Sequence, residues 1–203
     1  MSKVLVTESY LTDIGNAIRS KNGGTTKYKP SEMAAAINGI TTQGTTQDNT
    51  VLNSILDRSI SGDYVNEDLT EIGKYAFAYC ENLISATFKK ATKIDTMAFY
   101  SCSSLESISL PEVKEIDTMA FKYCSLKSIS MPKVEILGDE DYTGIFADCP
   151  MTTINIPSSI KSISQEAFKN SNLTTITIDR RADAISGSPW GATGATVSWT
   201  GEM

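Results

Sequence analysis

Four cysteines offer this sequence a choice of chemistries, because thiols form disulfides, bind zinc or act as nucleophiles. Their spacing is regular, with 22, 22 and 25 residues separating Cys80, Cys102, Cys124 and Cys149. No two of them form the Cys-x-x-Cys pair that is typical of zinc and redox sites. The spacing instead favours four reduced thiols in a buried ladder, because unpaired cysteine is often buried. Oxidation of neighbours such as Cys80 and Cys102 outside the cell stays open.

Other residues give little support to catalysis or cofactor binding. The sequence has no histidine among its 203 residues, which excludes Ser-His-Asp and Cys-His catalysis. Nothing marks a glycosidase pair among the 24 acidic residues. The glycines at 23–24 lack phosphate-loop spacing, and the acidic segment 138–141 lacks that of a calcium-binding EF-hand. We therefore predict a protein that is not an enzyme and that holds no cofactor or metal.

The charge balance restricts the class of partner. The chain has 18 basic and 24 acidic residues, and its longest basic runs are the pairs 89–90 and 180–181. Nucleic acid is an unexpected partner, because phosphate binding needs a basic patch. The sequence contains no run of about 18 apolar residues, which is the length needed to span a membrane. The first residues, 1–14, do not form a signal peptide, because their apolar run is short and interrupted.

An internal repeat determines the expected architecture. An Ala-Phe pair recurs along the chain, with Ile-Phe once in the same role, and the segment DTMAF occurs at both 95–99 and 117–121. A cysteine follows three residues after four of the phenylalanines, and Ser171 follows the fifth. A repeat of this length is typical of a solenoid. Intervals of 22, 22, 25 and 22 residues separate the phenylalanines, which are Phe77, Phe99, Phe121, Phe146 and Phe168.

Each repeat contains a short stretch that alternates between apolar and polar residues, as in Ile154-Asn-Ile156. This alternation predicts a strand with one buried face. Proline follows three of these strands and is expected to end them. A second apolar pair comes next, for example Val134 and Ile136. The Ala-Phe-x-x-Cys segment that closes each unit is predicted to form a single helical or 3₁₀ turn.

A unit of about 22 residues cannot bury its own apolar face, whereas stacked units bury it against one another. We therefore predict a solenoid of five units over 69–183, with the phenylalanines and cysteines forming its core. Residues 138–144 are expected to leave the fourth unit as a loop. The C-terminal segment, 184–203, would close the solenoid, with Trp190 and Trp199 as the capping side chains.

The N-terminal third lacks the repeat. Residues 8–20 and 30–40 each have apolar residues at helical spacing, and a glycine-containing loop separates them. We expect a small all-α hairpin module over 1–40 and a polar linker over 41–50. Residues 51–68 would then form a capping helix and the start of the solenoid.

The repeat resembles the BspA-type leucine-rich repeat. The segments that carry this resemblance are IGKYAFAYCENL (72–83), IDTMAFYSCSSLESISLP (94–111) and IDTMAFKYCSLKSISMP (116–132). They depart from the family pattern at Asp95 and Asp117, which replace the usual glycine, and at Leu126, which comes one residue early. The resemblance covers about two thirds of the chain and implies a leucine-rich-repeat solenoid of short strands.

Two shorter segments resemble proteins associated with the tails and baseplates of phages and prophages of Gram-positive bacteria. They are LTDIGNAIRSKNGGTTKYKPSEMAAAI (11–37) and SPWGATGATVSWTG (188–201). This resemblance implies a virion protein, and a virion protein needs no signal peptide.

Small polar side chains occupy the outward positions of the predicted strands, and we call this set the hydroxyl face. Such a ladder either keeps a solvated sheet soluble or binds a protein or glycan by hydrogen bonds. Tyrosines near the turns, at 79, 100, 123 and 142, would form a second contact edge or pack half-buried. The hydroxyl face comprises Ser85, Thr87, Ser107, Ser109, Ser128, Ser130, Thr153, Asn155, Thr175 and Thr177.

These observations favour a non-catalytic, tail-associated phage or prophage protein. Its N-terminal module would attach to other virion proteins, and its repeat would bind a host surface protein or glycan, or a neighbouring subunit. Homo-oligomerisation stays open. The alternative is a bacterial BspA-like surface adhesin or protein–protein interaction module, located at the cell surface or in the cytoplasm.

Overall fold

The computed structural model describes residues 55, 58–138, 144–182 and 184–201. The chain divides into two units, Met1–Asp57 and Arg58–Met203, and nearly all described residues belong to the second. The predicted helical module (1–40) and linker (41–50), and the loop expected within 138–144 except for its two end residues, lie outside the described residues. Among the described residues, no helix has the length and apolar character that a membrane span requires.

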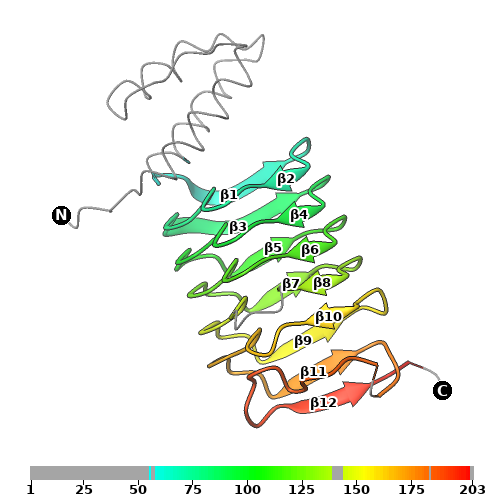
Figure 1. Cartoon of the computed structure of the whole chain (residues 1–203). Coiled ribbons are helices and arrows are strands. Elements are labelled where there is room, and N and C mark those ends of the chain that lie inside the picture. Colours follow the sequence, from blue (N-terminus) through cyan, green and yellow to red (C-terminus); the bar gives the residue numbers. More distant parts are fainter. Residues whose placement is uncertain (1–54, 56–57, 139–143, 183, 202–203) are drawn as a thin grey trace. The chain divides into compact units, whose positions relative to one another are not determined.

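The second unit is a solenoid in which each coil contributes one strand to the same side of the molecule (Figure 1). These strands form a four-stranded sheet and a neighbouring three-stranded sheet, which we together call the main sheet. All neighbouring strands that pair are parallel, and the order is β1-β3-β5-β7 followed by β9-β11-β12, with β9 beside β7. We number the coils from one to six by the strands β1, β3, β5, β7, β9 and β11. The main-sheet strands are β1 (Ser61–Asn66), β3 (Asn82–Phe88), β5 (Ser107–Ser109), β7 (Ser128–Ser130), β9 (Thr153–Ile156), β11 (Thr175–Ile178) and β12 (Thr196–Trp199).

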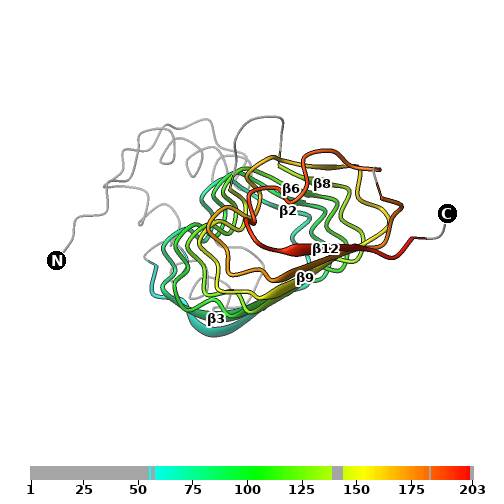
Figure 2. The same cartoon turned by 90° about the horizontal axis from the view of Figure 1, so that it is seen from below.

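A minor sheet lies on a second side of the coils and is also parallel. Viewed along the solenoid, the two sheets and the turns surround a single interior (Figure 2). One apolar side chain per strand enters this interior. For coil four that residue is Leu137, so the predicted role of Ile136 is wrong by one position. The strands are β2 (Glu71–Ile72), β4 (Lys93–Ile94), β6 (Glu115–Ile116), β8 (Ile136–Leu137) and β10 (Ser162–Ile163).

The repeated phenylalanines form a continuous stack inside the solenoid. Neighbouring rings are nearly parallel, with centroids 5.0, 5.2, 5.6 and 5.8 Å apart from Phe77 to Phe168. Each of these rings is at most 1% exposed. Because protein interiors are close-packed, each ring packs directly against the rings of the neighbouring coils. The expected solenoid, with one shared interior, is therefore what the structure shows.

The segment around each phenylalanine is a series of β-turns, so of the two predicted forms the helix is wrong, whereas the hydrogen bond of a 3₁₀ turn, to a carbonyl three residues earlier, is present. In coil one, the amides of Ala76, Ala78 and Cys80 donate to carbonyls three residues earlier, while the amides between them donate to coil two. Tyr75 and Tyr79 have φ of 59° and 62°, and such left-handed residues interrupt a helix. The turns therefore satisfy their own backbone and also link the coils.

The solenoid begins and ends differently from its middle. Residues 58–68 contain β1, which pairs with β3 with a shift of register between Gly62 and Asp63. At the other end the fully buried Trp190 packs edge-on against Phe168, with ring centroids 6.4 Å apart, and donates from Nε1 to the Ser186 carbonyl. Trp199 follows, 6.3 Å from Trp190. The two tryptophans thus terminate the ring stack.

Candidate binding surface

The hydroxyl face lies on the outer side of the main sheet, in two rows that follow the strand register. Within a row, residues of adjacent strands pair directly, as Ser107 does with Ser128 and Thr153 with Thr175. All ten side chains are exposed or half-buried. Because paired strands lie about 4.8 Å apart, each row presents one small polar group at that interval from β3 to β7 and again from β9 to β11, with β9 beside β7 but not paired with it.

The structure extends these rows by one strand at each end. Asp63 and Val65 precede them in β1, and Thr196 and Ser198 follow them in β12. Ser85 Oγ donates to Asp63 Oδ1 at 2.7 Å. The alternation at 195–199 is visible in the sequence and could have identified the β12 pair. The β1 pair lacked such a signal, because the inward positions of that strand are Tyr64 and Asn66 rather than aliphatic residues.

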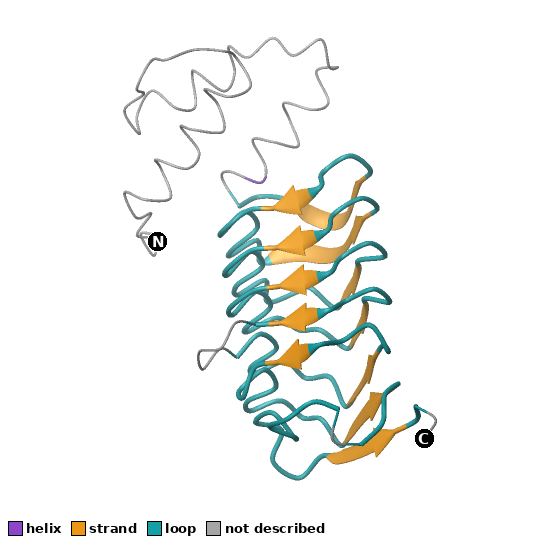
Figure 3. Cartoon of the chain, turned by 45° about the vertical axis from the view of Figure 1, so that its right-hand side comes forward, coloured by secondary structure: helices purple, strands orange, loops and turns teal. Residues whose placement is uncertain are grey.

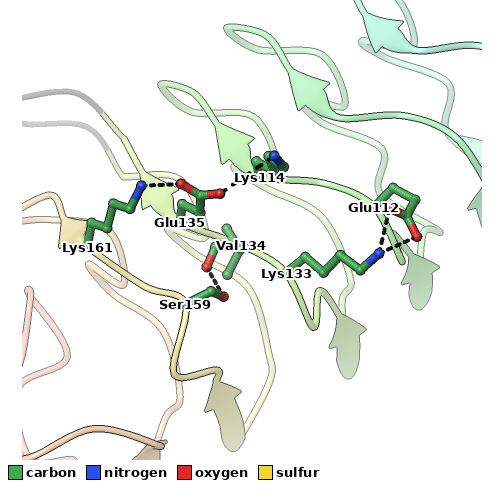
Figure 4. Close-up of polar contacts among 7 residues, drawn as sticks. All are labelled: Glu112, Lys114, Lys133, Val134, Glu135, Ser159 and Lys161. Atoms are coloured by element: carbon green, nitrogen blue, oxygen red, sulfur yellow. Dashed lines mark hydrogen bonds and ion pairs between the residues drawn. The ribbon is translucent and has the colours of Figure 1, made fainter.

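From Ser107 to Ser198, no charged side chain occupies either row. Charged side chains lie beside the two rows, in ion pairs that join successive coils, such as Glu106 with Lys127 at 2.7 Å. Figure 4 shows further pairs on the segment between the two sheets, where Lys133 contacts Glu112 and Glu135 lies between Lys114 and Lys161. The Lys161 ammonium hydrogen-bonds to Glu135 and lowers the pKa of that carboxyl.

Shallow grooves hollow the surface of the solenoid. One, of about 330 Å³, contains Ser130, Asn155 and Thr177 of the hydroxyl face, with Met131 and Ile156 beside them. A larger one, of about 470 Å³, lies over the minor sheet and includes Glu115 and Asp117 but none of the hydroxyl face. The first groove has the mixture of apolar lining and a few polar groups that ligand sites show.

The four cysteines are free and buried. The Sγ atoms of Cys102, Cys124 and Cys149 each donate to the carbonyl of a phenylalanine in the preceding coil, at 3.0 to 3.1 Å. Burial raises the pKa of the Cys124 thiol well above its ordinary value and that of Cys149 to about 12. Among the described residues, no group of three or more cysteine or acidic side chains is placed to hold a metal. Cys102, Cys124 and Cys149 therefore join neighbouring coils by hydrogen bonds to the backbone, and burial favours the protonated thiol at Cys124 and Cys149.

Ser171 occupies the cysteine position of coil five and tests this role. Its Oγ is buried without a hydrogen-bond partner, whereas a thiol at this position of the repeat donates to the preceding coil. We expect Ser171→Cys to raise the free energy of unfolding by about 1 kcal/mol, measured by urea denaturation. Ser171→Ala is the control, because it removes the unsatisfied hydroxyl without supplying a donor. A Ser171→Cys protein less stable than the parent would contradict the ladder.

A stack of parallel short strands around one apolar interior defines a leucine-rich-repeat solenoid. The BspA type leucine-rich repeat region model matches six copies over residues 59–144 and 142–189. The chain belongs to this family. The crystal structure of a leucine-rich repeat protein from T. pallidum (TpLRR) is similar, with 22% identity, a TM-score of 0.55, and 67% of this chain and 69% of that chain covered. The search of curated proteins finds no match.

Leucine-rich-repeat solenoids are typically interaction modules rather than catalysts, and they present an extended surface to other proteins. The matched copies begin at residue 59, at the first coil, whereas the sequence analysis placed the first unit at 69. The family and the fold therefore support a role in protein–protein interaction or adhesion.

Proposed function

We propose that this chain is a non-catalytic binding protein whose hydroxyl face docks on a protein or glycan surface. The observation that carries the proposal is the uncharged pair of rows between Ser107 and Ser198, which spans five strands of two neighbouring sheets, β5 and β7 in one and β9, β11 and β12 in the other. Small hydroxyl and amide groups donate and accept hydrogen bonds, and they lose little side-chain entropy when a partner covers them. The regular interval between rungs suits a partner that itself repeats, such as a polysaccharide chain or an extended protein edge.

At a finer level, we propose a tail-associated protein of a phage or prophage of Gram-positive bacteria. The support is the resemblance of segments 11–37 and 188–201 to such proteins. In this arrangement the N-terminal segment attaches the chain to other virion proteins, and the solenoid faces the host surface. A BspA-like bacterial surface adhesin is the second candidate, because an adhesin would use the same repeat in the same way.

The hydroxyl face is tested by placing charge and bulk on it. We expect the parent chain to bind cell walls purified from Gram-positive bacteria, and Ser130→Lys with Thr177→Lys to weaken that binding about tenfold, as loss of a central contact does. Sedimentation of the walls with labelled protein measures the bound fraction. Lys161→Gln, on the segment between the sheets, is the matched control and should bind as the parent does.

Two outcomes of this experiment would count against the proposal. One is that the protein carrying Ser130→Lys and Thr177→Lys binds the walls as strongly as the parent does. The other is that the parent chain binds neither the walls nor wall proteins. Immunogold labelling separates the two finer candidates. Label on tail structures of induced particles supports the virion protein, whereas label confined to the cell envelope supports the adhesin.

A further inference from the structure

Three tyrosines form a connected cluster in the turns of coils one to three, between the minor-sheet and main-sheet strands. The turns of the solenoid are drawn in teal in Figure 3. The rings of Tyr79 and Tyr100 lie 5.6 Å apart between centroids, and those of Tyr100 and Tyr123 lie 5.5 Å apart. Both contacts are edge-to-face. Tyr79 and Tyr123 nevertheless remain 41% and 45% exposed. We call Tyr79, Tyr100 and Tyr123 the tyrosine cluster.

The turns themselves do not require tyrosine. Tyr79 and Tyr123 share one position of the repeat with Ser101, Asp148 and Asn170, and φ at this position lies between 55° and 62° in all five coils. A left-handed backbone disfavours bulky side chains and favours asparagine, aspartate and glycine. The two tyrosines therefore occupy these positions at a conformational cost, and strain of this kind is concentrated at binding sites.

The apolar character of the surface is confined to the same end of the solenoid. The large apolar side chains that are exposed among the described residues all lie between residues 65 and 123. Half-buried Tyr75, Met97 and Met119 occupy equivalent positions in the turns that carry the cluster. Tyrosine and methionine are enriched at the centres of protein interfaces. Coils four and five instead present Asp148 and Asn170 at this edge.

The lysines beside the cluster differ from the other lysines of the described region. That region contains ten lysines, and ion pairs hold eight of them. The two without a carboxylate partner are Lys74 and Lys122. Their ammonium groups lie over the rings of Tyr75 and Tyr123, at 5.6 and 4.8 Å from the ring centroids. Of the only described lysines free to pair with a partner's carboxylates, Lys122 therefore lies against the cluster itself, and Lys74 lies over Tyr75 in the turn that carries Tyr79.

The geometry points to one class of ligand: we propose that the tyrosine cluster, with Lys74 and Lys122, binds an acidic segment of a partner protein that packs apolar side chains against the tyrosines. Sugar stacking is disfavoured, because edge-to-face contacts and the Lys122 ammonium already occupy ring faces. A protein segment needs only the exposed edges and hydroxyls of the rings, and its carboxylates complement the two lysines. This surface is separate from the hydroxyl face and does not rest on its proposed role.

The probe is a displayed library of random peptides, selected on the immobilised full chain. We expect enrichment of peptides in which aspartate or glutamate flanks aromatic or aliphatic residues, and weaker binding as salt is raised. Tyr123→Asn and Lys122→Gln should each lower the affinity of an enriched peptide about tenfold, the loss typical of a hot-spot contact. Asparagine is chosen because Asn170 already occupies the equivalent left-handed position, so the variant is expected to fold.

Coil five supplies a matched control, because Lys169→Gln changes the position equivalent to Lys122 two coils further along the solenoid. This variant should bind the enriched peptides as the parent does. The proposal is overturned if no peptide is enriched over the Tyr123→Asn protein, or if enriched peptides are basic. Binding of polygalacturonate that is lost in Tyr123→Asn, in place of peptide binding, would assign the cluster to a glycan. A parent dimer that becomes monomeric in Tyr123→Asn would assign it to a second copy of this chain.

Discussion

Replacing Phe121 by alanine is expected to lower the free energy of unfolding by about 3–5 kcal/mol, the range for loss of a buried aromatic ring. Phe121 is fully buried at the middle of the stack. Its ring lies 5.2 Å from that of Phe99 and 5.6 Å from that of Phe146, nearly parallel to both. Neither neighbour can move into the vacated space without leaving its own coil, so a cavity remains.

Urea denaturation followed by circular dichroism measures this loss. Ser128→Ala on the exposed side of β7 in the following coil is the control and should leave the midpoint within the small range typical of surface changes. Because coils interact with their neighbours only, the variant can also separate one transition into two. A Phe121→Ala protein with the same midpoint as the parent would mean that the ring stack does not hold the coils together.

The solenoid is predictable from the sequence because the residues that repeat are the residues that form its interior. The phenylalanine interval, the alternating strands and the proline stops each follow from packing or backbone rules that act within one coil and its neighbours. The minor-sheet register fails at Ile136 and Leu137, because two adjacent apolar residues satisfy either register. Only the spacing of three residues between Val113 and Ile116, and between Ile160 and Ile163, would have favoured Leu137.

The backbone conformation of the turns and the contacts on the surface are harder to predict from the sequence. The left-handed backbone at Tyr75 and Tyr79 could not be predicted from the residue types, because bulky residues are not typical of that conformation. The hydroxyl face is visible as alternation, so its rows are predictable although its partner is not. The contacts of the tyrosine cluster depend on three coils at once. The two lysines without a carboxylate partner, Lys74 and Lys122, emerge only when every other lysine of the described region has been assigned its carboxylate.

The buried thiols are expected to make the protein lose stability at alkaline pH. Burial raises the pKa of Cys149 to about 12 from an ordinary value of 9.0, and it raises that of Cys124 in the same direction. Between pH 9.0 and about 12 the unfolded chain therefore releases a proton from Cys149 that the folded chain retains. Stability that is complete below pH 9 is lost as pH rises, by about 1.4 kcal/mol per pH unit for each such thiol.

Urea denaturation at intervals from pH 8 to 10 measures this slope, and most of that range lies below the ordinary titration of tyrosine and lysine. The pKa values of Tyr64 and Tyr100 are also raised by burial, so their contribution has the same sign but begins at higher pH. Cys149→Ala is the matched control. It should be less stable than the parent at pH 8, because the Phe121 carbonyl loses one of its two donors and keeps only the Cys124 amide, yet its stability should fall less steeply above pH 9. Equal slopes in the two proteins would show that Cys149 already ionises in the folded state, and that the thiol ladder is open to solvent.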